Sequence, residues 1–402
     1  MAEKSNIQPA DPLEHTLLHK LLVQTDRLQS LPAVAVALLL ALNITITTLW
    51  WAWSGRDSTT VMLIALGYTL ASVVDWVGLR TLRTSGRSYG PEKPSVLALS
   101  ALRALLLIAL AVFSAPSWLA LLVLALISLL VFYATWIEPF RLGVTEQQYH
   151  TAKWSAAAPP LRLLQIGDIH MERVTPRERD LNRLIDDLKP DIIVFTGDFV
   201  NLSNTHDPQA EAAIREIIGQ WRAPLGVYCV SGTPLVEPLE RVHAFVDGLN
   251  NLRLLPNQWI TVNTPGGMLN ILGLVVTHDM QRDREQLKKM MMIAPKSGLH
   301  LLLMHPPDIA PEANELGVDL YLCGHTHGGQ IRLPVIGALF SSSHLGNRFI
   351  MGRYELGTTT LYTSRGVGLE GLGAPRARFL CPPEIILWEI RGTNPHPTPD
   401  LR

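Results

Sequence analysis

The stretch Leu161-Arg-Leu-Leu-Gln-Ile-Gly-Asp-Ile-His170 decides how the second half of this 402-residue chain is interpreted. Its first six residues are mostly apolar, which predicts a short, buried strand at Leu161–Ile166. Gly167, Asp168 and His170 follow at once, where that strand ends. In layered α/β proteins the carboxyl ends of the strands carry the functional residues. The stretch therefore predicts a buried strand that presents a carboxylate and an imidazole at its carboxyl end.

The residues around this stretch alternate between short apolar strands and helices with one apolar face. Strands are predicted at Leu161–Ile166, Ile192–Thr196, Gly226–Val230, Leu299–Met304 and Asp319–Cys323. Helices are predicted between some of them, at Arg177–Leu188 and Gln209–Trp221. This alternation is typical of an α/β or mixed layered domain.

Three more of these strands end in residues able to bind a metal. Taken alone, an Asp after a strand is often a helix cap, and a single His is usually a hydrogen-bonded polar residue. Two Asp and four His at strand ends, most of them beside glycines, have few structural uses as a set. We therefore interpret them as metal ligands: Asp168, His170, Asp198, His305, His325 and His327.

The ligand types narrow the chemistry. Mixed carboxylate and imidazole ligands suit Mn, Fe or Zn better than Ca or Mg. An Asp can bridge two ions about 3.5–4 Å apart, which is the arrangement used to hydrolyse phosphate esters. The neighbouring glycines allow the backbone and a phosphate to approach closely.

The series Asp-x-His, Gly-Asp, His and Gly-His-x-His resembles the calcineurin-like metallophosphoesterases. Three further segments are similar to the membrane-anchored YaeI-like and YkuE-like branch of that family: Gly324-His-Thr-His-Gly-Gly-Gln-Ile-Arg-Leu-Pro334, Tyr362-Thr-Ser-Arg-Gly366 and Arg378-Phe-Leu-Cys-Pro-Pro-Glu-Ile385. The resemblance covers roughly residues 160–391. It implies a four-layer α/β (α+β) sandwich that holds two divalent metal ions.

The resemblance also implies how the ligands divide. One metal would be held by Asp168, His170, Asp198 and His327. The second would be held by Asp198, His305 and His325, together with an Asn from a Gly-Asn-His-Asp/Glu motif. A hydroxide that bridges the two metals would attack the phosphorus in line.

The chain departs from the family at that motif, where it reads Ser231-Gly-Thr-Pro-Leu235. Thr233 stands at the ligand Asn, and a hydroxyl is a poorer metal ligand, so the second site should be weaker. Pro234 stands at the His that steadies the phosphate or protonates the leaving group, and loss of a general acid typically costs on the order of 10²–10⁴-fold in rate. We therefore assign no catalytic side chain with certainty.

Two interpretations of this departure are open. One is a weakened or inactive relative that acts as a metal-binding scaffold or sensor. The other is an active enzyme whose leaving group is acidic enough to need no proton, or which uses another histidine: His206, His243 or His278. Spacing does not choose among these three. Arg365 matches a family position and is either a phosphate contact or an anchor for its loop.

The first half of the chain is different in kind. Four apolar runs of about 20 residues predict a four-helix transmembrane region: Pro32–Trp53, Thr59–Leu79, Ser95–Ala115 and Ser117–Ile137. Within these runs, Asp75 and Arg103 either form an ion pair across helices or each reach separately to the interface.

Basic residues set the expected orientation. Seven Lys and Arg lie in the N-terminal tail and in the loop between the second and third runs, against only Arg56 in the two opposite loops. The positive-inside rule therefore places both termini in the cytosol. By resemblance, the membrane is the bacterial inner membrane.

Composition agrees with this division. The first 138 residues contain 17 charged residues, about 12%, whereas the remaining 264 contain 52, about 20%. The net charge is −1 for the whole chain, which disfavours nucleic acid as a partner. The three cysteines are expected to pack as small apolar residues.

We therefore predict a cytosol-facing, membrane-anchored phosphoesterase that hydrolyses phosphodiester or pyrophosphate bonds of a small-molecule or lipid-linked substrate at the bilayer. The predicted boundaries are a cytosolic tail at 1–31, four transmembrane helices at 32–138, a linker at 139–160, the catalytic domain at 161–391 and a disordered tail at 392–402.

Overall fold

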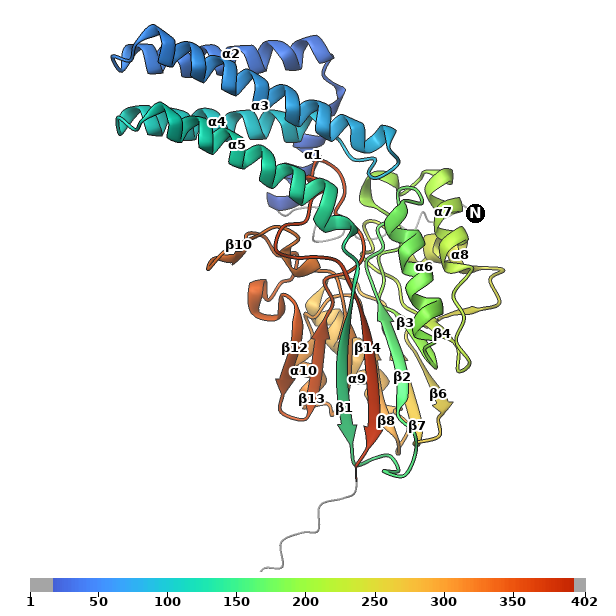
Figure 1. Cartoon of the computed structure of the whole chain (residues 1–402). Coiled ribbons are helices and arrows are strands. Elements are labelled where there is room, and N and C mark those ends of the chain that lie inside the picture. The colour runs from blue at the N-terminus through green and yellow to red at the C-terminus, as the bar shows by residue number, and fades with distance from the viewer. Residues whose placement is uncertain (1–16, 394–402) are drawn as a thin grey trace, which may run out of the picture. The chain divides into compact units, whose positions relative to one another are not determined.

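The computed structural model describes residues 17–393, so the first 16 residues and most of the predicted disordered tail lie outside it. The described chain forms two compact units (Figure 1). The helical unit contains Leu17–Phe140 and a later segment, Glu370–Phe379. The second unit contains the described residues from Arg141 to Leu369 and from Leu380 onward.

The helical unit is built around four long apolar helices. They are α2 (Ala33–Trp53), α3 (Ser58–Thr84), α4 (Lys93–Val112) and α5 (Ser117–Phe132), the last continued by helical turns η3 (Tyr133–Ile137) and η4 (Glu138–Phe140). A short helix α1 (Leu17–Asp26) and a turn η2 (Arg27–Ser30) precede them. The four long helices have mean hydropathies between 1.7 and 2.5, so all four are long and apolar enough to cross a membrane. The prediction of four helices that are long and apolar enough to span a membrane is confirmed.

The two charges within these helices form an ion pair. Arg103 on α4 lies 2.6 Å from Asp75 on α3, measured from guanidinium nitrogen to carboxylate oxygen, and both side chains are buried. Arg103 also donates a hydrogen bond to Ser128 on α5, at 2.8 Å. Of the two alternatives left open by the sequence, the structure therefore shows the pair.

The second unit contains two mixed six-stranded sheets and a small hairpin. The first sheet has the order β1 (Gly143–Thr151), β14 (Glu384–Gly392), β2 (Leu161–Ile166), β3 (Ile192–Phe195), β4 (Val227–Cys229) and β5 (Leu252–Leu254). The second has the order β12 (Gly352–Leu356), β13 (Thr359–Thr363), β9 (Leu320–Cys323), β8 (Leu299–Leu303), β7 (Met268–Gly273) and β6 (Gln258–Asn263). The hairpin joins β10 (Arg332–Leu333) to β11 (Gly337–Ala338).

The buried side chains define four layers. Leu163 and Val194 of the first sheet pack in one core with Leu301 and Leu322 of the second. The outer face of the first sheet is covered by α6 (Pro176–Leu188), α7 (Pro208–Ile218) and α8 (Leu239–Val246). The outer face of the second sheet is covered by α9 (Met280–Met292) and α10 (Ala310–Glu315). The predicted fold, a four-layer sandwich preceded by four apolar helices, is confirmed.

One segment differs from its prediction. Residues 139–160, expected to be a linker, contain β1, which pairs in parallel with β14 over nine residues from Gly143 to Thr151. The strand lies at the edge of the sheet and most of its side chains are exposed or half-buried, so its sequence is largely polar. An edge strand of this kind lacks the apolar run that marked the buried strands.

Candidate metal centre

Loops at the carboxyl ends of four strands bring together all six residues that the sequence singled out. Asp168 and His170 follow β2, Asp198 follows β3, and His305 follows β8. His325 and His327 follow β9. All six side chains are buried.

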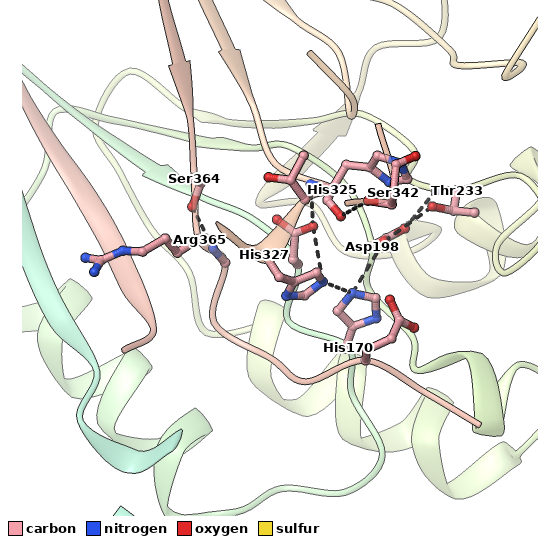
Figure 2. Close-up of polar contacts among 12 residues, drawn as sticks. His170, Asp198, Thr233, His325, His327, Ser342, Ser364 and Arg365 are labelled. Carbon is pink, nitrogen blue, oxygen red and sulfur yellow. Dashed lines mark hydrogen bonds and ion pairs between the residues drawn. The ribbon is translucent and has the colours of Figure 1, made fainter. Parts of the chain in front are cut away.

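The six residues form two groups whose ligating atoms lie within 4.8 Å of one another: Asp168, His170 and His327 in the first, and Asp198, His305 and His325 in the second. Figure 2 shows four of these side chains converging from three loops. These two buried triads are consistent with a binuclear metal site.

The topology explains why the loops meet. β2 and β3 are parallel neighbours in one sheet, and β8 and β9 are parallel neighbours in the other. Backbone hydrogen bonds join the loops themselves: the Asp168 amide donates to the Gly197 carbonyl, and the Gly324 amide donates to the His305 carbonyl. Candidate ligands that are far apart in the sequence are thus held at one edge of the sandwich.

Asp198 occupies the position between the triads. Its Oδ2 atom lies 3.4 Å from His170 Nε2 and 3.0 Å from His305 Nε2. Within the first triad, His170 Nε2 and His327 Nε2 lie 2.7 Å apart. A single carboxylate oxygen therefore faces one imidazole from each group, which is the geometry of a bridging ligand.

The backbone of the ligand loops is strained. Five of the six candidates have a left-handed backbone conformation, with φ of 52° at Asp168, 40° at His170, 59° at Asp198, 72° at His325 and 50° at His327. Such conformations are uncommon for residues other than glycine and cost of order 1 kcal/mol or more each. Strain of this kind concentrates at functional sites, because the surrounding fold must hold it in place.

Buried polar atoms and glycines show that the site fits a cation. Asp168 Oδ2 and His170 Nδ1 are buried and have no hydrogen-bond partner among the residues that the structure describes. A Cβ atom added at Gly232 would lie 2.0 Å from an Asp198 carboxylate oxygen, and one added at Gly324 would lie 2.1 Å from Asp168 Oδ2. The glycines therefore leave space around both carboxylates, and a divalent cation would satisfy the buried oxygen.

The charges in the site are coupled. Burial alone would lower the pKa of His305, but the Asp198 carboxylate outweighs it and raises that pKa to about 9. Burial would raise the pKa of Asp198, but His305 and the other imidazoles hold it well below its usual range. Burial raises the pKa of Asp168 to about 6. In the metal-free protein Asp198 is thus an anion at neutral pH and His305 carries a proton.

Neighbouring hydrogen bonds orient the His305 imidazole and hold the backbone of His325. His305 Nδ1 lies 2.8 Å from the Thr196 carbonyl oxygen and donates to it, so Nε2 is directed toward Asp198. The His325 amide donates to Asp168 Oδ1 at 2.7 Å, and the Ser342 hydroxyl donates to the His325 carbonyl. The first contact fixes the ring of His305, as is common for metal-binding histidines, and the other two hold the backbone of His325.

Thr233 lies beside the second triad, where the family ligand Asn was expected. Its amide donates to Asp198 Oδ1 at 2.7 Å, and its hydroxyl lies 3.4 Å from Asp198 Oδ2 (Figure 2). Thr233 therefore touches the carboxylate between the triads through backbone and side chain. Pro234 is half-buried and can neither donate nor accept a proton through its side chain.

The structure distinguishes the three histidines that spacing left equivalent. His206 and His243 are exposed. His278 is buried, and its ring centroid lies 5.4 Å from that of His325. Among the three, only His278 lies beside the ligand set.

Glu237 was missed by the sequence analysis. Its carboxylate accepts hydrogen bonds from the backbone amides of Asp198, Phe199, Val200 and Gly232 at 2.6–3.3 Å. Burial, and then the nearby Asp198 charge, raise its pKa to about 8. The Gly-Asn-His-Asp/Glu motif of the family ends in an acidic residue where this chain has Leu235. The signal that could have identified Glu237 is therefore an acidic residue two positions after the motif.

Arg365 pairs with Glu384. Its guanidinium donates to Glu384 Oε2 at 2.6 Å, and its amide donates to Oε1 at 3.1 Å. Figure 2 shows the side chain extending away from the imidazole cluster. The contacts favour the anchoring interpretation over the phosphate-binding one. The three cysteines are buried, as expected of small apolar residues.

Comparison with known proteins agrees with this geometry. The sequence profile of the calcineurin-like phosphoesterases matches residues 161–329. The chain is 31% identical to the phosphodiesterase YaeI of Escherichia coli over 239 residues, which are 58% of this chain and 83% of that protein. The chain therefore belongs to the calcineurin-like metallophosphoesterase family.

Two other relatives are similar over comparable lengths. The uncharacterized metallophosphoesterase YkuE of Bacillus subtilis is 29% identical over 65% of this chain and 90% of its own length. The protein described as the UDP-2,3-diacylglucosamine pyrophosphatase LpxG of Chlamydia trachomatis is 27% identical over 63% of this chain and 91% of its own length.

Proposed function

We propose that this protein is a membrane-anchored phosphoesterase that uses two divalent metal ions to hydrolyse a phosphodiester or pyrophosphate bond, with a lipid-linked substrate and a cytosolic catalytic unit. The observation that carries the proposal is the position of Asp198 Oδ2 within 3.4 Å of one imidazole from each triad. The donor set of two Asp and four His suits Mn, Fe or Zn.

The chain contributes binding and orientation. When bound, the ions supply Lewis acidity at the phosphate and a nucleophile from water at neutral pH. Asp168, His170 and His327 would hold one ion, and His305 and His325 the other, with Asp198 shared. Glu237 ties the backbone of Asp198 in place, and the Thr196 carbonyl fixes the tautomer of His305.

The residues of this chain limit which substrates can react, through the leaving group. Pro234 has no proton to donate, so the substrate that suits this site is one whose leaving group departs without protonation. A pyrophosphate or an aryl phosphodiester meets that requirement. The relative described as a UDP-2,3-diacylglucosamine pyrophosphatase supports a lipid-linked pyrophosphate as the substrate class.

The orientation in the membrane follows from basic residues. Lys20 and Arg27 precede the first apolar helix. Four more basic residues lie in the last two turns of α3, in the loop after it and at the first residue of α4: Arg80, Arg83, Arg87 and Lys93. By the positive-inside rule this side is cytosolic. The described residues contain four such helices, an even number, which supports a catalytic unit on the same side.

The proposal is tested with the full-length protein in detergent, assayed with Mn²⁺ and bis(4-nitrophenyl) phosphate. We expect measurable hydrolysis by the native protein and its loss in Asp198→Ala. Asp247→Ala, which removes an exposed carboxylate, is the matched control and should keep the native rate. Native activity that survives Asp198→Ala would contradict the mechanism.

Thr233 and Pro234 favour a second candidate, a metal-binding scaffold or sensor without activity. If this candidate is correct, the native protein should not hydrolyse the aryl diester. The double change Thr233→Asn/Pro234→His, which restores the family motif, should then produce activity. Native hydrolysis of the aryl diester would exclude this candidate. Two tightly bound ions per full-length chain, measured by elemental analysis, would weaken it.

A further inference from the structure

The β10–β11 hairpin carries an unusual set of exposed apolar side chains. In the segment from Ile331 to Phe340, here called the apolar hairpin, five large apolar residues are exposed: Leu333, Val335, Ile336, Leu339 and Phe340. Val335, at the tip, is fully exposed. Figure 1 shows β10 standing away from the sheets of its own unit.

The hairpin is built to present these side chains. Its ladder has only two pairs, Arg332 with Ala338 and Leu333 with Gly337, so little of its own structure covers them. Val335 has a φ of 68°, a conformation that is strongly disfavoured for a β-branched residue. A strained, fully exposed valine has no role in the core and points to a partner outside the fold.

Both ends of the hairpin are fastened to the ligand loops. Arg332 donates a hydrogen bond to the Gly328 carbonyl at 2.9 Å, one residue after His327. Ala338 is buried against Gly329, where an added Cβ would lie 2.4 Å from the alanine methyl. Just beyond the hairpin, the Ser342 hydroxyl donates to the His325 carbonyl. Whatever the tip contacts is therefore held next to the metal centre.

Charge indicates the nature of that partner. Residues 331–350 contain no Asp or Glu but include Arg332 and Arg348. Arg348 is exposed and lies over the ring of Phe349, with 5.0 Å from the guanidinium carbon to the ring centroid. Apolar tips flanked by arginines match a bilayer surface with anionic headgroups, into which the apolar groups insert.

Strand register locates the start of β1 relative to the metal centre within the same unit. Gly143, the first residue of β1, pairs with Glu384, and Ile386 pairs with Gln165 near the end of β2. The start of β1 thus lies at the edge that carries Asp168.

We propose that the apolar hairpin inserts into the membrane surface and holds the metal centre at the level of the lipid headgroups. A lipid-linked phosphate ester then reaches the metals without leaving the bilayer. This inference deepens the proposed function, on which its substrate class rests, while the insertion itself is observable without activity.

Insertion is tested on the full chain in liposomes of phosphatidylcholine and phosphatidylglycerol. The native cysteines are buried, so Val335→Cys provides one exposed thiol for an environment-sensitive fluorophore. Doxyl-labelled lipids should quench it. Met292→Cys, which replaces an exposed methionine at the end of α9, is the matched control and should not be quenched. A label at 335 that is quenched no more than the label at 292 overturns the proposal.

A second measurement compares substrates. Val335→Asp/Ile336→Asp should lower the ratio of lipid-linked to soluble diester turnover at least tenfold, whereas Met292→Asp/Ile293→Asp should leave that ratio unchanged. An unchanged ratio in the hairpin variant overturns the proposal. If the native protein hydrolyses neither substrate, the proposed function fails, and the quenching result still decides insertion.

Discussion

Asp198 Oδ2 lies 3.0 Å from His305 Nε2, and this buried pair connects the electrostatics of the site to its structure. His305 donates its other ring proton to the Thr196 carbonyl, so its Nε2 cannot turn away from the carboxylate. The carboxylate in turn raises the pKa of His305 to about 9, against the opposing effect of burial. A metal that binds here must therefore displace a proton.

The first prediction is that metal affinity rises with pH. Because His305 must lose its proton, the apparent association constant for Mn²⁺ should increase about tenfold per pH unit between pH 7 and 9 and level off above that range. Calorimetric titration of the metal-free protein checks this. An affinity that does not change between pH 7 and 9 would show that His305 is already neutral.

The same proton predicts the opposite pH dependence for stability without metal. The folded-state pKa of His305, about 9, lies above its ordinary value of 6.5, so the folded state holds the proton more tightly. This contribution to stability is complete below pH 6.5 and is lost as pH rises through 9. Thermal unfolding with a chelator should show a melting temperature that falls over this interval, and one that rises would contradict the prediction.

Gly324 is expected to be intolerant of a side chain. Gly324→Ala places a methyl group 2.1 Å from Asp168 Oδ2, which must then move, so we expect loss of at least one bound ion per chain. Gly143→Ala is the matched control, since a Cβ there meets no atom within 4 Å. Elemental analysis of both purified variants measures the difference. Two ions retained by Gly324→Ala would mean that Asp168 is not a ligand.

Glu237 is expected to stabilise the loop that carries Asp198. In Glu237→Gln an amide group replaces one acceptor oxygen and faces backbone N–H donors, so stability should fall by about 2 kcal/mol or more. Metal affinity should fall with it, because Asp198 loses its backbone support. Glu240→Gln, an exposed position on α8, is the control and should match the native protein in both measurements. An unchanged melting temperature in Glu237→Gln would refute this role.

The buried strands and the residues at their ends were predictable because they depend on local patterns. The Leu161–Ile166 strand was predicted with the bounds that the structure shows. Glu237 was not, because its role depends on amides 37–39 residues earlier in the chain. The edge strand β1 could not be predicted in the same way, because its sequence is largely polar and lacks the apolar run of a buried strand. Local sequence therefore locates the candidate ligands, whereas tertiary contacts decide which residues hold them in place.

The ion pair in the helical unit gives the last prediction. Asp75 and Arg103 are both buried, and Arg103 also donates a hydrogen bond to the neutral Ser128 hydroxyl, which cannot replace the carboxylate charge. Asp75→Asn should therefore lower the stability of the detergent-purified protein by about 3–5 kcal/mol, because it leaves a buried cation without its counter-ion.

A double change separates this effect from general damage to the helix. Replacing both partners, in Asp75→Asn/Arg103→Met, removes the cation together with the anion and should recover most of the loss, since buried ion pairs often exchange for uncharged groups at little cost. Thermal unfolding of the native protein, the two single variants and the double variant gives the coupling energy directly. If the two single losses simply add in the double variant, the pair does not stabilise the helices, and the charges act independently despite their 2.6 Å separation.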